Sequence, residues 1–264
     1  TWEFVKDFPM LDGKRYDDPT GKYYVGDEQA LLKAFWKNRD PRFNRACLYN
    51  GREWPEAGRS ADNRMYNALG VSNADDQYGV NPNAGVNAAN NDIFSGMYNY
   101  KVSDLSLTQD KVMTFDIDYI LMRFAEVMFI YAEAANENGH SDVAIDLLKQ
   151  IRKRAGIEAG ADGLYGLKVG SREEIRQAIL DERHIELCYE GHRFWDLRRW
   201  KVELPKLNEA AKGINITTDA TTGKYIYKTF DAEERNYSDY MYYGPIPYSE
   251  ILKYSNLKQN EGWK

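Results

Sequence analysis

Residues 179–200 gather side chains that could serve as acids, bases, metal ligands or ion-pair partners. Their last twenty positions hold five acids, four arginines, two histidines and four aromatic residues. Glu182, Glu186 and Glu190 recur every four residues, so in a helix they lie on one face. Two carboxylates can cleave a glycosidic bond when they flank the sugar about 5 to 10 Å apart. Carboxylates one turn apart point the same way, so the spacing disfavours hydrolysis by Glu186 and Glu190.

A metal site is the second chemistry that this segment suggests. His184, Cys188 and His192 recur every four residues, and zinc accepts nitrogen and sulfur ligands of this kind. Three such residues span about 12 Å along a helix, whereas each ligand must lie about 2 Å from the ion. No more than two could bind together, and Leu180 and Leu187 beside them indicate partial burial. We interpret the three as core residues and expect no metal or other cofactor.

The third interpretation is a polar strut that fixes neighbouring elements. Guanidinium groups pair with carboxylates in forked geometry, and aromatic rings can cover their planes. The segment supplies four of these groups: Arg183, Arg193, Arg198 and Arg199. We expect the glutamates to pair with arginines of this helix and of the upstream IRKRAG stretch. The candidates in that stretch are Arg152 and Arg154.

The elements that must position this segment are mostly helical. Apolar side chains recur at helical spacing from residue 117, break at NENGHS, and then resume. They predict an antiparallel helical hairpin over residues 117–155, about the size of one tetratricopeptide repeat. A single repeat cannot bury both of its faces. We therefore expect an apolar face around Leu121, Met128 and Leu148 that needs further helices or another chain.

Later segments predict one more long helix and a β-hairpin. Ser171 opens the capping-box pattern SREE, which begins a helix expected to reach about Tyr189. After Gly191, the HRFWDLRRW stretch either continues this helix or begins a second short one. Alternating Thr, Ile and Tyr predict a hairpin over residues 213–230. In the C-terminal segment, two prolines exclude a helix until about Ser249.

The first third of the chain predicts loops. Residues 1–112 are rich in Gly, Asn, Asp and Pro, and only residues 27–37 predict a helix. Residues 72–92 form a long Asn-, Gly- and Ala-rich loop, of a kind that is often functional or mobile. Asp75 and Asp76 could bind Ca²⁺, but the loop lacks the ligand order of an EF-hand. We interpret it as a flexible loop.

Composition excludes several classes of function. A net charge of −6 provides no basic stripe for nucleic acid. The sequence has no apolar run long enough to span a membrane, and its start, TWEFVKDF, has no signal-peptide pattern. Its two cysteines, Cys47 and Cys188, allow at most one disulfide. The 20 tyrosines and 6 tryptophans cannot all be buried, so some ring faces are available to ligands.

Several segments resemble one known family. Residues 179–200, ILDERHIELCYEGHRFWDLRRW, closely resemble the signature helix of the SusD/RagB family of outer-membrane nutrient-binding proteins. Four other segments resemble family elements in the family's order: Asp-Pro-Arg (36–51), Arg-x-Ala-Glu-Val (119–139), Ile/Val-Arg-x-Arg-Ala-Gly (147–157) and Pro-Ile-Pro (242–263). His184 and Cys188 stand where the family more often has Arg and a small residue. This departure further disfavours a metal role.

The resemblance implies a fold and a domain organisation. We expect a mainly α protein of tetratricopeptide-like helical hairpins with a loop-rich region and a small β-hairpin, of the SusD-like α/α superhelix type. Family members are longer and begin at a lipidated cysteine, so we expect residues 1–264 to be the C-terminal portion of such a protein. Within it we expect a loop-rich ligand-binding region at 1–112 and a helical core with a C-terminal segment at 113–264.

The resemblance also implies a function without chemistry on the substrate. Family members bind oligosaccharide or polysaccharide at the cell surface and cover a SusC-like TonB-dependent transporter that imports it through the outer membrane. We therefore expect a non-enzymatic glycan-binding protein with that transporter as its partner. The membrane contact is expected only through an N-terminal lipid anchor outside this chain.

The candidate ligand-binding residues come from the first third. Residues 48–66, LYNGREWPEAGRSADNRMY, combine rings and polar side chains in a Gly- and Pro-rich setting. Sugar C–H faces pack on such rings, and sugar hydroxyls hydrogen-bond to such polar groups. The candidates are Tyr49, Arg52, Trp54, Asn63, Tyr66 and Tyr78. For Trp54, a loop anchor packed on the domain is an equal alternative.

Two other functions stay open at this point. A carbohydrate-active hydrolase would also carry acids and aromatic residues, and turnover of polysaccharides would identify it. A helical-repeat scaffold would bind peptide or protein, and RagB-like relatives do handle peptides. Failure to bind any sugar would favour the scaffold.

Overall fold

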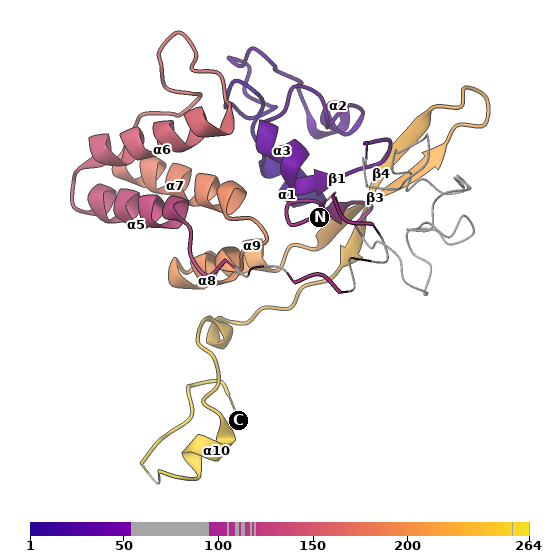
Figure 1. The fold of residues 1–264 in the computed structure, drawn as a ribbon. Coiled ribbons are helices and arrows are strands. Elements are labelled where there is room, and N and C mark those ends of the chain that lie inside the picture. Colours follow the sequence, from indigo (N-terminus) through magenta and orange to yellow (C-terminus); the bar gives the residue numbers. More distant parts are fainter. Residues whose placement is uncertain are drawn as a thin grey trace.

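Three long helices form one side of the molecule. The computed structural model describes residues 1–263 except 54–94, 105, 109–110, 112–113, 117, 119 and 255. The long helices are α5 (Phe124–Glu137), α6 (Ser141–Ala155) and α7 (Arg172–Glu186). Figure 1 shows them side by side, each in contact with the other two. The chain is mainly α, as the sequence predicts.

Small residues and a few large ones alternate in the core of this stack. In α5, Ala125 and Ala132 let the neighbouring helices approach, while the Phe129 ring fills the space between them. Leu148 of α6 and Ile179 of α7 close the cluster from the other two sides, each 1% exposed. Burying such side chains stabilises the stack by about 1.5–3 kcal/mol apiece.

Backbone conformation sets the ends of α7. The predicted capping box is present, because the Ser171 side chain accepts from Glu174 N at 3.2 Å and Glu174 accepts from Ser171 N at 2.7 Å. The helix ends before the predicted limit, since Tyr189 lies in the left-handed region at φ +63°. Gly191, at φ +82°, then begins the separate helix α8 (His192–Arg199). Of the two possibilities open for this stretch, a second short helix is therefore present.

The first third contains more helix than its sequence predicts. Its helices are α1 (Trp2–Asp7), α2 (Glu28–Leu32) and α3 (Pro41–Ala46). The 27–37 prediction is too long, and α1 and α3 were missed because six residues are too few for a periodic pattern. Local caps start both, since the Thr1 and Asp40 side chains accept from Phe4 N and Arg42 N. The strand β1 (Cys47–Leu48) follows α3 and pairs antiparallel with β2 (Tyr98–Asn99).

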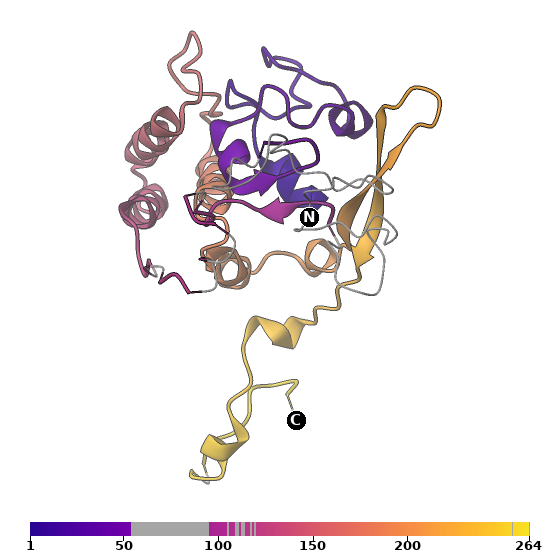
Figure 2. The same cartoon turned by 45° about the vertical axis from the view of Figure 1, so that its right-hand side comes forward.

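The predicted β-hairpin is present, with strands somewhat longer than expected. The strands β3 (Ala211–Thr218) and β4 (Tyr225–Glu233) pair antiparallel, with Ile214 opposite Thr229. In Figure 2 the tip of this hairpin projects away from the body, and the C-terminal segment extends in another direction. The remaining short helices are α9 (Leu204–Leu207), η1 (Asp239–Tyr242) and α10 (Tyr248–Ile251). Within the described residues, no helix has the length and hydropathy needed to span a membrane.

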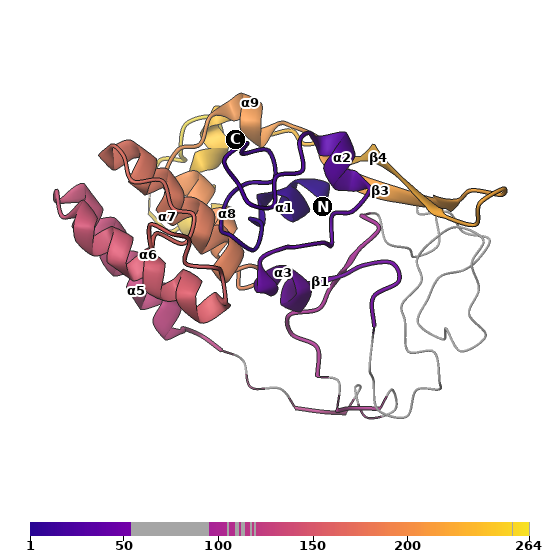
Figure 3. The same cartoon turned by 90° about the horizontal axis from the view of Figure 1, so that it is seen from above.

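A second buried cluster joins the first third to the hairpin. Trp2 and Phe8 from the α1 region, Phe35 and Phe43 pack in it with Ile214 of β3. Seen from above in Figure 3, α1 and α3 lie between the helical stack and the hairpin. The cluster thus combines segments from both sides of residue 112, the expected boundary between the two regions.

The apolar face predicted on the helical hairpin consists of different residues. The helix begins at Phe124 instead of residue 117, so Leu121 precedes it and is 85% exposed. Leu148 is buried inside the stack and Met128 packs against it, so these two do not form an open face. The exposed apolar side chains of α5 are instead Phe124, Val127, Ile130 and Tyr131.

Two glycine-bearing loops meet backbone to backbone where the first third contacts the helical stack. A methyl group on Gly13 would lie 1.9 Å from the carbonyl oxygen of Tyr165. The Arg152 side chain of α6 donates to both the Gly13 and Tyr165 carbonyl oxygens, at 3.1 and 2.9 Å. Only glycine fits between these loops, since Gly13 also has a φ of +79°.

We expect Gly13→Ala to lower the free energy of unfolding by about 3 kcal/mol or more, because a steric clash is added to an unfavourable φ. Gly163→Ala is the matched control, since Gly163 has a φ of +67° but nothing within 4 Å of its added methyl group. Its cost should be near 1 kcal/mol. Urea unfolding measures both, and equal losses would contradict the close approach.

Candidate ligand-binding site

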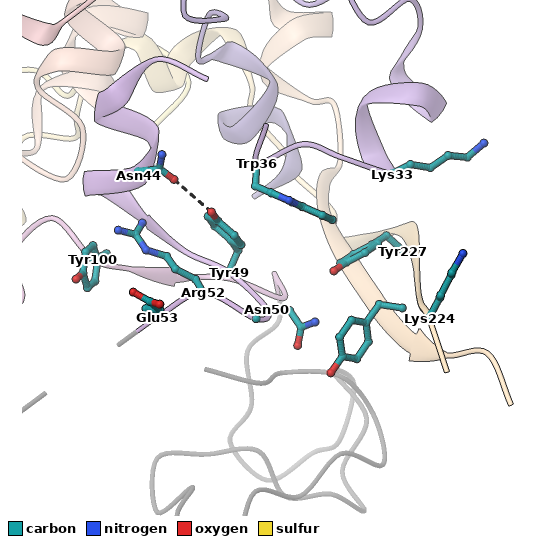
Figure 4. Close-up of a pocket in the computed structure, with 12 residues that line it drawn as sticks. Lys33, Trp36, Asn44, Tyr49, Asn50, Arg52, Glu53, Tyr100, Lys224 and Tyr227 are labelled. Atoms are coloured by element: carbon teal, nitrogen blue, oxygen red, sulfur yellow. Dashed lines mark hydrogen bonds between the residues drawn. The ribbon is translucent and has the colours of Figure 1, made fainter. Parts of the chain in front are cut away.

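An open cavity of about 710 Å³ lies where the first third meets the hairpin. One wall comes from the segment after α2, and the floor from α3 and the residues after β1. The opposite wall is the start of β4, as Figure 4 shows. The volume falls in the range of about 300–1,000 Å³ that ligand pockets occupy.

Aromatic rings form much of this cavity's surface. Trp36 and Tyr49 are stacked, with ring centroids 6.2 Å apart and planes at 19°. Tyr49 is also stacked on buried Phe43 at 5.6 Å, and Trp36 meets Tyr227 at 5.6 Å. Contacts with the buried core hold these rings from behind, so their positions are set before any ligand binds.

Polar groups stand beside the rings. The Tyr49 hydroxyl donates to Asn44 Oδ1 at 3.3 Å (Figure 4). Arg52 lies over the Tyr100 ring at 4.3 Å, and its Nη1 donates to the Cys47 carbonyl oxygen at 2.8 Å. Burial raises the pKa of Tyr49 and of Tyr227, so both phenols stay neutral. Neutral phenols can donate and accept hydrogen bonds, as sugar hydroxyls require.

Two of the sequence-predicted ligand residues line this cavity. Tyr49 and Arg52 both contribute to its surface. The other candidates lie outside the described residues: Trp54, Asn63, Tyr66 and Tyr78. The 72–92 loop with its possible Ca²⁺ ligands also lies outside them.

Sequence reasoning missed the rings contributed by Trp36 and by β4. Tyr225 and Tyr227 stand two apart in the KYIYKTF stretch, a spacing that places both on one face of a strand. That alternation was a usable signal. Trp36 carried none, because no local pattern indicates that its ring meets Tyr49 thirteen residues later.

A second cavity, of about 400 Å³, lies between α3 and α7. Arg42, Lys101, Arg154 and Glu186 line it, and no aromatic ring does so among the described residues. Glu186 already pairs with Arg42 and Arg154, and Lys101 pairs with Glu190. The aromatic cavity is therefore the stronger candidate for a ligand.

The acidic strip of α7 is the centre of a buried ion-pair network. Glu182 is 2% exposed and pairs with Arg152 at 2.6 Å and with Arg42 at 2.7 Å. Glu186 pairs with Arg42 at 3.1 Å and with Arg154 at 2.6 Å. The predicted partners Arg152 and Arg154 are confirmed. Arg42, from the distant α3, was not foreseen.

The third glutamate, Glu190, also pairs with basic residues from other segments. These are Arg123 at 2.8 Å and Lys101 at 2.5 Å. Within the 179–200 segment, Arg183 pairs with Asp196 at 2.8 Å. Arg199, itself on α8, pairs with Glu133 of α5 and with Asp196. The expectation that this segment's own arginines neutralise the glutamate strip is therefore wrong within the described residues.

Glu186 and Glu190 lack the electrostatics of a glycosidase pair. Burial raises the pKa of both carboxyls, but the arginines outweigh it, and each pKa lies below its ordinary value. A general acid needs a pKa raised toward neutrality so that it carries a proton to donate. These carboxylates are held ionised instead.

The three side chains considered as metal ligands contact different groups. His184 Nε2 lies 3.3 Å from Asp7 Oδ2, and its ring meets Phe4 edge to face. Cys188 lies in the buried cluster of the first third. His192 Nδ1 lies 3.2 Å from Arg183 Nη2, a cationic neighbour that opposes metal binding at this nitrogen.

The mainly helical architecture agrees with comparisons to known proteins. The model of the SusD family matches residues 1–263, so the chain belongs to the SusD family. The resemblance seen in the sequence is thereby confirmed.

The relatives are longer than this chain. SusD-like protein P2 of Formosa agariphila is 34% identical over 145 residues, which are 54% of this chain and 25% of the relative. SusD-like protein P38 of the same organism is 36% identical over 86 residues, 32% of this chain and 17% of the relative.

Two solved structures from Bacteroides fragilis share the fold. A SusD-like protein has a TM-score of 0.73 at 24% identity, covering 100% of this chain and 46% of that protein. A SusD-like carbohydrate binding protein has a TM-score of 0.61 at 19% identity, covering 97% and 47%. The chain therefore spans less than half the length of the proteins it matches.

Removal of Glu182 should destabilise the protein strongly. Glu182→Ala leaves Arg42 and Arg152 without this buried partner, a change that typically costs about 3–5 kcal/mol. Glu190→Ala, at the more exposed end of the same strip, should cost about 1 kcal/mol. Urea unfolding of both variants gives the comparison, and a smaller loss for Glu182→Ala than for Glu190→Ala would refute the buried network.

Stability should also fall at acid pH. Burial raises the pKa of Glu182, but Arg152 and Arg42 outweigh it, so its folded-state pKa lies below the ordinary 4.5. The resulting stability is complete above the unfolded-state pKa and is lost as pH falls through the folded-state pKa. We expect a nearly constant urea midpoint at neutral pH and a progressive decrease below about pH 4.5. Glu182→Gln should decrease less steeply, and an equal slope in that variant would contradict the assignment.

Proposed function

We propose that this chain binds glycan in the aromatic cavity, without chemistry on the sugar. The observation that carries the proposal is the set of core-supported rings, Trp36, Tyr49 and Tyr227, around an open cavity of about 710 Å³. Apolar C–H faces of a sugar ring bury well against such rings, while neutral hydroxyls beside them take its hydrogen bonds. The solved relative called a carbohydrate binding protein has the same fold.

The whole protein would act at the cell surface. We propose that it captures oligosaccharide or polysaccharide for a SusC-like TonB-dependent transporter in the outer membrane. A lipid anchor outside this chain would hold it there. Membership of the SusD family supports this assignment.

The proposal of a non-catalytic role rests on where the acidic side chains lie and on their ionisation. Glu53 is the one acidic residue among the described lining residues of the cavity. Glycoside hydrolysis by the usual mechanisms needs two carboxyl groups across the bond. Glu186 and Glu190 supply two carboxyl groups, but both form ion pairs with basic residues and both have lowered pKa values.

We expect Trp36→Leu to weaken binding of a cognate oligosaccharide by about tenfold, equivalent to about 1.4 kcal/mol, because it removes a ring face. Leucine keeps apolar contact with the core, so the fold should survive. Trp195→Leu is the matched control, since Trp195 is 66% exposed on α8 and does not line the cavity.

Isothermal titration calorimetry against an oligosaccharide panel provides the measurement, with circular dichroism to verify folding. Unchanged affinity in Trp36→Leu would remove the cavity as the binding site. No heat with any sugar, but binding of peptides, would replace the proposal with a peptide-binding scaffold. Release of shorter sugars by the wild-type protein would show an enzyme instead.

A further inference from the structure

The aromatic cavity carries positive charge on an acidic protein. The sequence has 41 acidic and 35 basic residues, giving a net charge of −6. The described lining of the cavity reverses this balance, with Lys33, Arg52 and Lys224 against Glu53. Three cations and one anion leave a local excess of two positive charges.

The two lysines of this lining have no acidic partner within the described residues. Both Lys33 and Lys224 are exposed, and neither takes part in an ion pair in that part of the structure. Six other described lysines do form ion pairs, such as Lys6 with Glu28 at 2.8 Å. The ammonium groups at the cavity are therefore available for an external anion.

Arg52 is charged and already held in position. Its guanidinium lies over the Tyr100 ring and is tied to the Cys47 carbonyl oxygen, but it forms no ion pair within the described residues. A side chain ordered in advance loses less conformational entropy when it binds a ligand. Arg52 thus adds a fixed cation to the two exposed lysines.

The three cations border the ring surfaces from different elements. Lys33 follows α2, Arg52 follows β1, and Lys224 precedes β4. In Figure 4, Trp36 and Tyr227 lie between Arg52 on one side and the two lysines on the other. A sugar chain stacked on these rings would bring its substituents toward both groups of cations.

We propose that the cavity selects anionic glycans, meaning sugars that carry carboxylate or sulfate groups. This inference rests on the proposed glycan-binding function and names its substrate class. Lysine ammonium groups are compact charges with three rotatable donors, so they accept either anion in variable geometry. The phenols of Tyr49 and Tyr227 are neutral, so they do not repel the anion. Unpaired surface cations also raise the rate at which an anionic ligand arrives.

The test compares matched pairs of oligosaccharides by calorimetry. One pair is oligogalacturonate and its carboxyl-reduced neutral form, and the other is a sulfated oligosaccharide and its desulfated form. We expect at least one acidic member to bind about tenfold more tightly than its neutral partner at low salt. This preference should shrink at high salt, because the contacts are exposed and screened.

The variant Lys33→Gln/Lys224→Gln should lose about fivefold in affinity for the acidic glycan, the effect of two surface contacts, and little for the neutral one. Lys153→Gln/Lys258→Gln is the matched control. It removes the same charge at exposed positions that do not line the cavity, and it should keep the preference.

The outcomes separate this inference from the proposed function. Equal affinity for acidic and neutral members of both pairs, with binding still sensitive to Trp36→Leu, overturns only the acidic preference. A preference that persists in Lys33→Gln/Lys224→Gln overturns the role of these lysines. If no glycan of either pair or of the wider panel binds, the proposed function fails and the inference fails with it.

Discussion

The ion pairs of Glu182 are the constraint on which the rest of the structure depends. This carboxylate belongs to α7, and its two arginines belong to α6 and α3, so a single buried charge connects three elements. A buried carboxylate is very unfavourable unless its charge and lone pairs are satisfied. The three elements must therefore meet in one arrangement. Arg152 extends the constraint further, because it also holds the two loops that touch at Gly13.

The cavity depends on this network through a short stretch of chain. Asp40 pairs with Arg42 at 2.6 Å, and Arg42 also pairs with Glu182 and Glu186, which fixes the start of α3 against α7. Phe43, the residue after Arg42, lies in the core, and Tyr49 stacks on its ring at the cavity floor. The segment from Asp40 to Arg52 thus carries ion pairs at one end and ligand-facing groups at the other. The ion pairs therefore fix the position of the rings at the cavity floor, although the ion pairs themselves do not line the aromatic cavity.

The sequence predicted those features whose signals are local. The capping box at Ser171 and the hairpin near 213–230 follow from spacing over a few residues. The pairing of the glutamates with Arg152 and Arg154 spans about 30 positions, and opposite charge on two predicted helices was its signal. The contacts of Arg42 with α7 and of Trp36 with Tyr227 join residues more than a hundred positions apart. No pattern along the chain encodes such distances. The start of α5 was misplaced for a related reason: apolar residues before Phe124 continue the helical spacing but lie exposed outside the helix.

The buried network and the cavity use arginine and lysine for different physical reasons. Arginines occupy the buried network, where a planar, forked group can satisfy two carboxylates at once, as Arg42 does with Glu182 and Glu186. At the cavity, Arg52 is joined by two exposed lysines, whose strongly hydrated and flexible charges lose little by remaining in water until a ligand arrives. A lysine in place of Arg42 would leave carboxylate lone pairs unsatisfied. Arginines in place of Lys33 and Lys224 could stack on the cavity's rings, as Arg52 does on Tyr100, and would then occupy faces that a sugar needs.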